Sequence, residues 1–393
     1  MEVKPKIESF ARIKVLGIGG SGTNAVNRMT ELGIKGVEFI AVNTDAQALH
    51  NNKSDKKVHI GRTITKGLGS GMNPELGRQA AEESIEDLEE VISSSDMVFI
   101  TCGLGGGTGT GAAPIVAELA KNKGILTVAV VTKPFTFEGS KRKEVAEVGY
   151  DNLKDKVDAI ISIHNDRILQ IIDKKTSLVE AFKTVDEVLR QGISGISDLI
   201  TTHGVVNADF ADIKSIMQDA GTALMGIGHA SGENRAAEAA KQAINSPLLE
   251  LTIDGAKGVL FNITGGSGLG MFEIDEAAKV ITKSIDPDAK VKFGAVIDES
   301  MGEEVRITVI ATGFDETNKR PGHMALNFSE ETKKPMIMEN KPASVINTMP
   351  APEIRKPLFN PKPMQAPAPM SQQPETESDD ELDIPAFIRK KMK

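Results

Sequence analysis

The stretch Gly103-Leu104-Gly105-Gly106-Gly107-Thr108-Gly109-Thr110-Gly111 decides the fold that this sequence predicts. It follows an apolar run at residues 97–102, which predicts a buried strand, and it precedes residues 112–120, which predict a helix with Pro114 in its first turn. Glycines let backbone N–H groups converge on an anion, a helix N-terminus adds partial positive charge, and the two threonines add hydroxyl donors. Because a plain turn needs only one or two glycines, this arrangement indicates a phosphate-binding site.

A second glycine-rich turn lies near the start of the chain. Residues 12–18 predict a strand, Gly17-Ile18-Gly19-Gly20-Ser21-Gly22 follows, and a helix is expected over residues 23–32. This G-x-G-x-x-G pattern is typical of dinucleotide-binding folds. Residues 37–43 predict the next strand, and Asp45 beyond it is either a ribose ligand or the cap of a following helix.

Strands alternate with helices over the first ~175 residues, which predicts an α/β fold with a doubly wound, Rossmann-like sheet. Further strands are expected at residues 58–61, 125–131 and 158–163, and helices at 74–91 and 177–201. The loop at 67–74 either closes over a phosphate or is mobile. Beyond the long helix, strands at 222–228, 258–264, 291–297 and 305–311, with helices at 233–245 and 273–284, predict a smaller second α/β domain.

This pattern divides the chain into six predicted parts. They are an N-terminal extension (1–11), a nucleotide-binding domain (12–175), a central helix (176–202), a C-terminal domain (203–313), a disordered linker (314–380) and a terminal peptide (381–393). The linker holds most of the 18 prolines and no apolar periodicity, so it lacks the apolar surface that would offset ordering entropy. The peptide places four apolar residues between acids and bases, which indicates either a partner-binding motif or an inert charged end.

Composition restricts the partners that this chain can have. The net charge of −9 argues against a general nucleic-acid binder, which needs a basic face. Residues 1–10 have no apolar centre of a signal peptide, and no apolar stretch is long enough to insert directly into a membrane. Cys102 lies in an apolar strand, where a buried filler is expected rather than a reactive thiol. These features fit a cytoplasmic location.

Two glycine loops in one sheet can face one ligand, and the second, denser loop with threonines suggests a nucleoside triphosphate. The sequence contains no G-x-x-x-x-G-K-[ST] motif, so no P-loop lysine is available. Backbone amides, hydroxyls and a cation, for which Mg²⁺ is expected, must then balance the phosphate charge.

These motifs resemble those of the tubulin/FtsZ family of GTPases over about residues 10–316 and the last dozen residues. The similar stretches are Gly105-Gly106-Gly107-Thr108-Gly109-Thr110-Gly111, Asn43-Thr44-Asp45-Ala46-Gln47, Lys133-Pro134-Phe135, Phe137-Glu138-Gly139, Asn165-Asp166, Asn207-Ala208-Asp209-Phe210-Ala211-Asp212 and Asp383-Ile384-Pro385-Ala386-Phe387. The resemblance implies a GTP-binding domain, a long central helix, a C-terminal GTPase-activating domain and a disordered tail. Ser21 and Thr23 replace the glycine or asparagine common in this family, which implies a modest change in phosphate contacts.

The resemblance also implies which residues bind GTP or GDP. These are Gly20, Ser21, Gly22, Thr23, Asn24, Ala25, Asn43, Thr44, Gly105, Gly106, Gly107, Thr108, Gly109, Thr110, Glu138, Arg142, Asn165, Phe182 and Asp186.

Two pairs among these residues, each spaced four apart, have a structural alternative to ligand binding. Glu138 and Arg142 lie four residues apart, so on a helix they form either a surface ion pair or, as the resemblance implies, contacts to the ribose and the phosphates. Phe182 either packs in the core or stacks on guanine. Asp186, four residues on, would accept hydrogen bonds from the guanine ring N–H and amine, where adenine offers an acceptor nitrogen instead.

Asp209 and Asp212 lie three apart at the expected start of a helix, after Asn207. Ordinary helix capping explains them, but two carboxylates can also orient a water and attract a cation. The resemblance implies that these three residues are catalytic and enter the nucleotide site of the next subunit, so that hydrolysis accompanies growth of a head-to-tail filament.

The resemblance therefore implies a self-assembling GTPase of the cell-division ring, at the mid-cell septum near the inner face of the membrane. Residues 382–388 are expected to recruit membrane-tethering and regulatory division proteins. The alternatives are an NAD(P)-dependent oxidoreductase, based on residues 17–22 and Asp45, and a scaffold without enzymatic activity.

Overall fold

The computed structural model describes residues 11–314 except 35, 174, 202, 203, 205, 207, 250 and 251. The predicted linker and the terminal peptide at 381–393 lie outside the described residues, as does Asn207.

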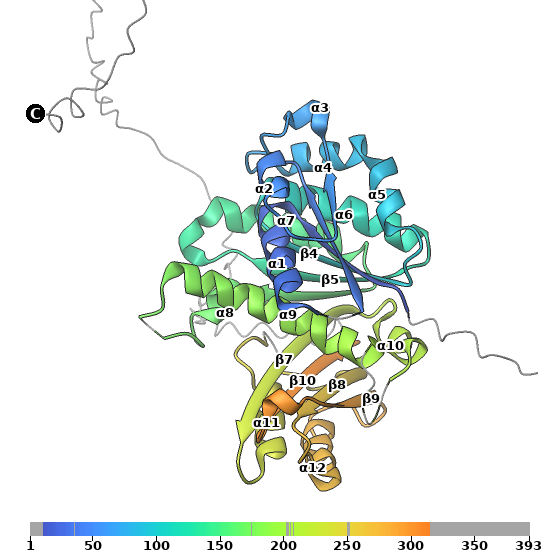
Figure 1. Cartoon of the computed structure of the whole chain (residues 1–393), viewed down its shortest axis with the longest axis vertical. Coiled ribbons are helices and arrows are strands. Elements are labelled where there is room, and N and C mark those ends of the chain that lie inside the picture. The colour runs from blue at the N-terminus through green and yellow to red at the C-terminus, as the bar shows by residue number, and fades with distance from the viewer. Residues whose placement is uncertain are drawn as a thin grey trace, which may run out of the picture. The chain divides into compact units, whose positions relative to one another are not determined.

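All ten predicted strands are present and form one sheet in the order β3-β2-β1-β4-β5-β6-β7-β10-β8-β9 (Figure 1). The strands are β1 (Ile13–Ile18), β2 (Val37–Asn43), β3 (Lys56–His59), β4 (Met97–Gly103), β5 (Leu126–Lys133), β6 (Ala159–His164), β7 (Gly221–Ser231), β8 (Gly258–Gly265), β9 (Lys290–Ile297) and β10 (Glu304–Thr312). Every pairing from β3 to β7 is parallel, whereas β10 runs antiparallel to both of its neighbours. The α/β class and the doubly wound sheet are confirmed.

Helices cover both faces of the parallel half of the sheet. The helices are α1 (Gly19–Leu32), α2 (Ala46–His50), α3 (Arg62–Thr65), α4 (Pro74–Glu83), α5 (Ile85–Ile92), α6 (Gly107–Asn122), α7 (Ser140–Lys154), α8 (Asn165–Ile168), α9 (Leu178–Thr201), α10 (Phe210–Met217), α11 (Arg235–Ile244) and α12 (Met271–Thr282), with short 3₁₀ turns η1 (Thr136–Glu138) and η2 (Glu299–Met301). One apolar core joins the sheet to α1, α9 and α10, and a second joins it to α4, α5, α6 and α7. Strands buried on both faces explain the continuous apolar runs in the sequence.

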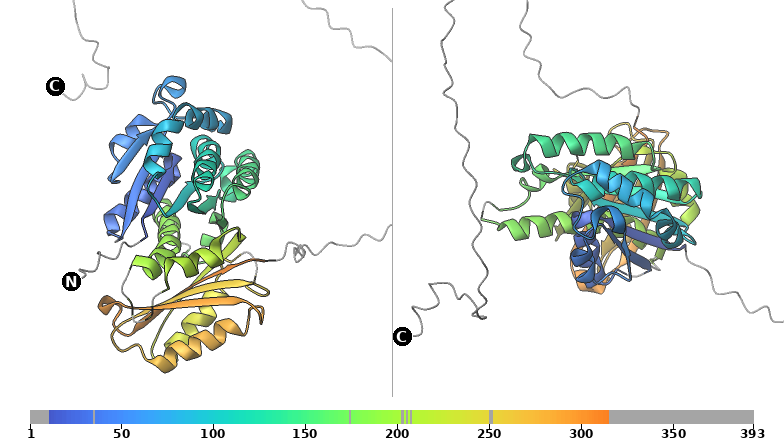
Figure 2. Two further views of the ribbon diagram at one scale, coloured as in Figure 1. Left: turned by 90° about the vertical axis from the view of Figure 1, so that its right-hand side faces the viewer. Right: turned by 90° about the horizontal axis from the view of Figure 1, so that it is seen from above.

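The C-terminal strands have their own core under α11 and α12, whose ribbons lie together below these strands in the left view of Figure 2. Helix α11 lies close to β7, because a Cβ on Gly226 would lie 2.0 Å from the Ala243 carbonyl oxygen and one on Gly228 would lie 2.0 Å from that of Ala239. The predicted smaller α/β region is therefore present, and β7 links it to the parallel strands by pairing with both β6 and β10.

The predicted long central helix is confirmed as α9, which runs between the two parts of the sheet in Figure 1. Gly192 and Gly195 weaken a helix by propensity, yet both are buried inside it. A Cβ on Gly192 would lie 2.9 Å from Met225 Sδ, and one on Gly195 would lie 2.8 Å from a Thr308 methyl group. The glycines are therefore explained by close packing of α9 against β7 and β10.

The glycine-rich stretch at residues 103–111 is not entirely a loop, because its second half is helical. Helix α6 begins at Gly107 rather than at residue 112, so Pro114 lies inside the helix and not in its first turn. The reason is tertiary packing: a Cβ on Gly107 would clash with the Ser70 hydroxyl, and one on Gly111 would clash with the Pro74 carbonyl. Close contact with α4 and the loop before it outweighs the low helix propensity of glycine.

Two other helix boundaries differ from prediction. The helix expected over residues 74–91 is broken at Ser84 into α4 and α5, where the Ser84 hydroxyl accepts a hydrogen bond from Gly61 N at 3.1 Å. Helix α1 begins at Gly19, within the first glycine turn, instead of at residue 23.

Cys102 is fully buried in β4, and burial raises the pKa of its thiol to about 12, as expected for an inert filler. Over the part of the chain that the structure describes, none of the helices combines the length and apolar character that a membrane span requires.

Replacement of Gly111 by alanine tests the packing explanation. Alanine favours helix, but its Cβ would clash with the Pro74 carbonyl, so we expect Gly111→Ala to lower the free energy of unfolding by about 1–3 kcal/mol in urea titrations. Gly106→Ala is the matched control, because Gly106 has φ −87° and its added Cβ would come no closer than 3.9 Å to another residue. Equal stability of the two variants would contradict the explanation.

Candidate functional site

The candidate site lies where the strand order reverses, because β1 pairs with β2 on one side and with β4 on the other. In an open α/β sheet the ligand crevice forms at this point, outside the carboxyl ends of the strands. Helix α1 begins directly after β1, and α6 begins a few residues after β4. The order β3-β2-β1-β4-β5-β6 is shared with dinucleotide-binding folds, so topology alone does not distinguish the two nucleotide classes.

The two glycine turns touch each other. Gly19 has φ +73°, and a Cβ there would lie 2.7 Å from Gly109 N. A Cβ on Gly103 would lie 2.7 Å from Ser21 Oγ. The first-turn N–H groups of α1 and α6, which have no acceptor within their helices, are thereby brought to one place.

A cavity of about 580 Å³ opens beside these turns. Seven of the predicted ligand-binding residues line it: Ser21, Asn24, Glu138, Arg142, Asn165, Phe182 and Asp186. They come from α1, η1, α7, α8 and α9, so residues distant in the sequence form one wall of one site.

Several polar atoms in this wall have no protein partner. The Arg142 guanidinium and the Glu138 carboxylate pair at 2.8 Å, and Glu138 also accepts from Phe135 N at 3.0 Å. The Nε atoms of Arg142 and Arg28 and the Oδ1 atom of Asn165 are buried without a hydrogen bond. Because buried polar groups are normally satisfied, these atoms indicate a polar ligand that carries both donors and acceptors.

Phe182 lies at the edge of the cavity and is not a core residue. Its side chain is 42% exposed, and its ring meets Phe135 edge to face at a centroid distance of 5.6 Å. One ring face is therefore available to a planar ligand such as a nucleobase.

Asp186 follows one helical turn later on the same wall. Burial raises the pKa of its carboxyl group to about 6, and the nearby Arg28 guanidinium partly opposes this shift. The Asp186 carboxylate is half-buried and loses hydration, and only the Arg28 charge compensates in part. Such a carboxylate is suited to accept hydrogen bonds from a ligand.

The other predicted ligand residues lie around the cavity without lining it. Gly20 is exposed at the start of α1, whereas Gly22, Thr23, Ala25, Asn43 and Thr44 are buried beneath it. Asn43 Oδ1 accepts from Thr44 N at 2.9 Å. Gly105, Gly106, Gly107, Thr108 and Gly109 form the turn and first residues of α6. The Thr110 hydroxyl accepts from Gly105 N at 2.9 Å and so braces the turn.

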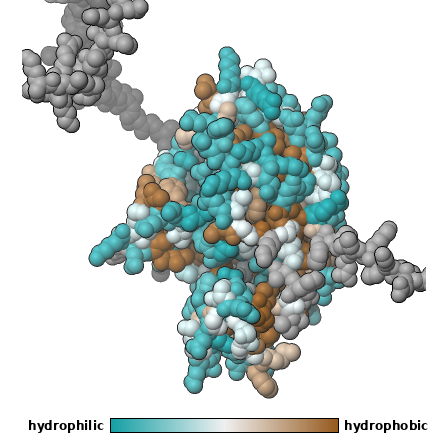
Figure 3. Space-filling model, in the orientation of Figure 1, coloured by the Kyte–Doolittle hydropathy of each residue, from teal (hydrophilic) through white to brown (hydrophobic). Residues whose placement is uncertain are grey.

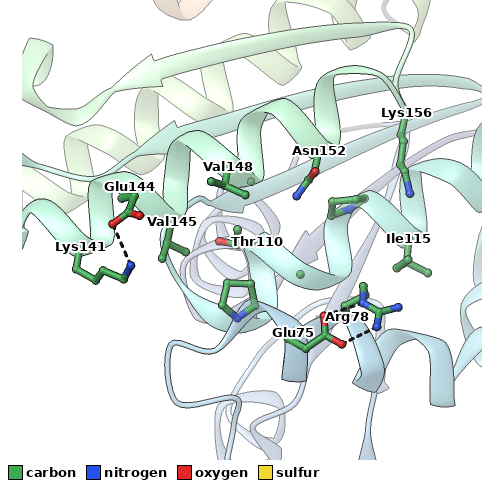
Figure 4. Close-up of a pocket in the computed structure, with 14 residues that line it drawn as sticks. Glu75, Arg78, Thr110, Ile115, Lys141, Glu144, Val145, Val148, Asn152 and Lys156 are labelled. Atoms are coloured by element: carbon green, nitrogen blue, oxygen red, sulfur yellow. Dashed lines mark hydrogen bonds and ion pairs between the residues drawn. The ribbon is translucent and has the colours of Figure 1, made fainter.

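Thr110 also lines a separate cavity of about 400 Å³ between α4, α6 and α7 (Figure 4). Arg78 and Glu75 of α4, which form an ion pair, and Lys141 of α7 lie on the rim of this second cavity. Thr110 therefore supports the glycine turn from behind.

Asp45 is a helix cap. Its carboxylate accepts from Gln47 N at 2.9 Å and from Ala48 N at 3.0 Å, the free donors at the start of α2. Of the two alternatives for Asp45, the structure shows the helix cap, and both capping bonds are accepted by Oδ1.

Asp209 and Asp212 lie at the start of α10 and do not line the 580 Å³ cavity. Asp209 caps the helix by accepting from Asp212 N at 2.7 Å, and Asp212 pairs with Lys292 of β9 at 2.8 Å. The cavity within one chain therefore lacks both carboxylates.

The sequence analysis missed several residues of the cavity wall. They are Asn27, Arg28 and Glu31 of α1, Lys183 of α9, and Thr132 and Pro134 at the end of β5. Helical spacing from Asn24 would have indicated the residues on α1, since positions 24, 27, 28 and 31 share one face.

Comparison with known proteins identifies the family. Residues 12–173 match the model of the tubulin/FtsZ family GTPase domain, and residues 221–315 match the model of the FtsZ family C-terminal domain. The chain belongs to the tubulin/FtsZ family. FtsZ of M. jannaschii, solved as an empty dimer, is 46% identical with a TM-score of 0.75 over 78% of this chain and 89% of that chain.

Two less similar solved structures share the fold. CetZ2 from Haloferax volcanii, solved as a GTPγS-bound protofilament, is 20% identical with a TM-score of 0.67 over 78% of this chain and 94% of that chain. CetZ1 from the same organism, solved as a GDP-bound monomer, is 22% identical with a TM-score of 0.68 over 78% of this chain and 96% of that chain.

Family membership makes this chain a GTPase that binds GTP and GDP. The oxidoreductase alternative loses its support, because the family model that matches residues 12–173 is that of a GTPase domain.

The raised pKa of Asp186 predicts a pH-dependent effect on stability. Its folded pKa is about 6 and an unfolded aspartate titrates near pH 4, so the folded chain binds more protons between these values. The ionised carboxylate therefore destabilises the fold at neutral pH, and this effect disappears as the pH falls. We expect Asp186→Asn to raise the free energy of unfolding by about 1 kcal/mol at pH 7.5, after a discount for solvent screening, and by much less at pH 4.5.

Urea titrations of the wild type and Asp186→Asn at both pH values check this expectation. Asp198 on the same helix has its pKa raised to about 6, chiefly by burial, and remains in both proteins, so the difference between them isolates Asp186. The same difference at both pH values would rule out the proposed ionisation.

Proposed function

We propose that this chain is a self-assembling GTPase that hydrolyses GTP to GDP and phosphate between head-to-tail subunits. The main support for this proposal is that the cavity residues and the α10 carboxylates lie apart in one chain. The cavity at the sheet reversal has the donors, acceptors and aromatic face that suit a guanine nucleotide, while Asp209 and Asp212 lie on α10 outside that cavity.

Within the cavity each residue has a proposed role. Phe182 stacks on guanine, Asp186 accepts from its ring N–H and exocyclic amine, and the orphaned Oδ1 of Asn165 accepts another base donor. Glu138 contacts the ribose and Arg142 the phosphates. The first turns of α1 and α6 supply backbone N–H groups to the phosphate oxygens.

The second half of the site is proposed to come from a neighbouring copy. Asp209 and Asp212 would orient the attacking water, together with Asn207, which lies outside the described residues. Phosphoryl transfer depends mainly on such positioning and on charge neutralisation. A contact that joins two different faces of the same chain does not close and therefore gives a filament.

The exposed apolar side chains support such a contact. Phe137, Leu169, Ile171, Leu178 and Val179 are exposed, and Val179 also lines the cavity. Figure 3 shows apolar surface gathered at the left, over the start of α9 and the adjoining loops. Met271 and Phe272 of α12 are exposed in a different region. Contiguous apolar surface of this kind is typical of an interface. The dimer and protofilament structures of relatives agree with assembly.

Mg²⁺ is proposed to accompany GTP. Among the residues that the structure describes, no group of three or more acidic, histidine or cysteine side chains is placed to hold a metal ion. Mg²⁺ is often bound through substrate phosphates and waters with only one or two carboxylates, so the nucleotide itself would supply ligands. The bound ion would neutralise developing charge on the phosphates.

In the cell, we propose that the filament forms the division ring at mid-cell, on the cytoplasmic side near the membrane. Residues 382–388, outside the described part of the chain, are proposed to recruit membrane-tethering and regulatory division proteins. No contact with nucleic acid and no direct insertion into the membrane are proposed. A scaffold role is compatible with this proposal, since the filament would itself be the scaffold.

Mixing two inactive variants tests the shared site. Asp186→Ala impairs the nucleotide half and Asp212→Ala impairs the hydrolytic half, so each alone should hydrolyse GTP poorly. In an equal mixture with random order, about one interface in four joins two intact halves, and we expect GTP turnover to recover to about a quarter of the wild-type rate. Phosphate release measured against mixing ratio checks this, and a mixture no more active than its components would contradict a shared site.

Lys292→Ala is the control for the structural role of Asp212, because it removes their ion pair and retains the carboxylate. We expect it to keep most of the GTPase activity. If Lys292→Ala and Asp212→Ala lose activity equally, Asp212 acts through its pairing with Lys292 and has no direct role in hydrolysis.

Removal of residues 382–393 tests the terminal peptide. We expect GTP turnover to stay at the wild-type level, because the cavity and α10 do not include these residues, and recruitment to the division site to be lost. The measurements are phosphate release and localisation of a fluorescent fusion. A truncated chain that still localises normally would contradict the proposed role.

A further inference from the structure

Three buried hydroxyl groups form a continuous chain behind the phosphate turn. Thr108 Oγ1, in the first turn of α6, lies 2.7 Å from Thr44 Oγ1 and 2.8 Å from Ser70 Oγ. The side chains belong to three separate segments and are 7%, 0% and 6% exposed, respectively. From these two distances alone, either hydroxyl of each pair could be the hydrogen-bond donor.

The number of protons shows what this chain of hydroxyls lacks. Each hydroxyl has one proton to donate and two lone pairs that accept, so two hydrogen bonds use only two of the three protons. One proton needs an acceptor outside the three side chains, because a buried proton without a partner is costly. Thr108 lies in the first turn of α6, where an anion is expected, whereas Thr44 is 0% exposed. A phosphate oxygen can accept the remaining proton when both neighbours donate to Thr108.

We propose that Thr44 and Ser70 are positioning residues that hold the Thr108 hydroxyl as a donor to a phosphate oxygen of the bound nucleotide. This inference rests on the proposed function. The first turn of α6 is where an anion is expected, and Thr108 is the central member of the chain. A hydroxyl that accepts two hydrogen bonds is polarised and becomes a stronger donor itself.

The backbone around Ser70 holds it in place for this role. The loop before α4 is tied down by hydrogen bonds from Ala46 N to Gly67 O at 3.2 Å and from Gly69 N to Thr44 O at 3.3 Å. Gly107 allows the final approach, because a Cβ there would clash with Ser70 Oγ. The loop at residues 67–74 is expected from the sequence either to close over a phosphate or to be mobile. The geometry favours a role at the phosphate, exerted through Thr108.

Thr44→Val and Ser70→Ala test the proposal, since each removes one hydroxyl with little change in volume. Dilute wild-type and variant proteins are titrated with GDP and with guanosine, which shares the base and ribose but has no phosphate. We expect both variants to bind GDP about threefold to tenfold more weakly and guanosine with unchanged affinity. Thr44→Ser, which keeps the hydroxyl, should restore GDP affinity.

Two outcomes would overturn the inference. Equal weakening of GDP and guanosine indicates a general loosening of the site, and unchanged GDP affinity in both variants indicates that Thr108 needs no support. If either variant fails to fold, the other still decides, since they remove opposite neighbours of Thr108. Failure of the wild type to bind GDP would instead count against the proposed function, so the two failures are distinguishable.

Discussion

The close contact between two helix N-termini is the constraint on which the rest of this structure depends. Helices α1 and α6 follow two neighbouring strands, and their first-turn N–H groups, which have no acceptor within the helices, lie close together. Gly19 and Gly109 meet where a single added Cβ would lie 2.7 Å from a backbone nitrogen. The glycines are needed for this approach as much as for turn geometry. Their cost in helix propensity is offset by the packing of α6 against α4, which keeps even residues 107–111 helical.

Electrostatics completes the pocket that this contact begins. The chain has no P-loop lysine, so backbone amides and a few side chains must meet the charge of a triphosphate. Two arginine Nε atoms and one asparagine oxygen remain buried and unsatisfied, and burial raises the pKa of the Asp186 carboxyl group. The cavity wall thus holds polar groups in a less favourable state than water would provide. A ligand that satisfies them recovers this energy, and such preorganisation favours binding specificity over stability of the fold.

Helix α9 connects this pocket to the C-terminal strands. Its first half presents Phe182 and Asp186 to the cavity, and its second half packs through Gly192 and Gly195 onto β7 and β10. Because the helix is continuous from Leu178 to Thr201, the cavity wall at one end and the contacts to β7 and β10 at the other belong to one element. The carboxylates of α10 lie beyond that element and do not line the cavity.

The amino-acid sequence by itself determined the ten strands, the long helix and the expectation of a phosphate-bearing ligand, while the choice of GTP depended on the family resemblance. Apolar periodicity and glycine spacing are local signals, so they can be read from the sequence without knowledge of the fold. Tertiary structure alone decided the start of α6, the break at Ser84 and the membership of Arg28 and Lys183 in the cavity wall. It also turned Asp45 into a cap and Phe182 into an exposed face, where sequence left both alternatives open. These features depend on which surfaces meet across the sheet, and contacts between residues far apart in the chain leave no periodic signal in the sequence.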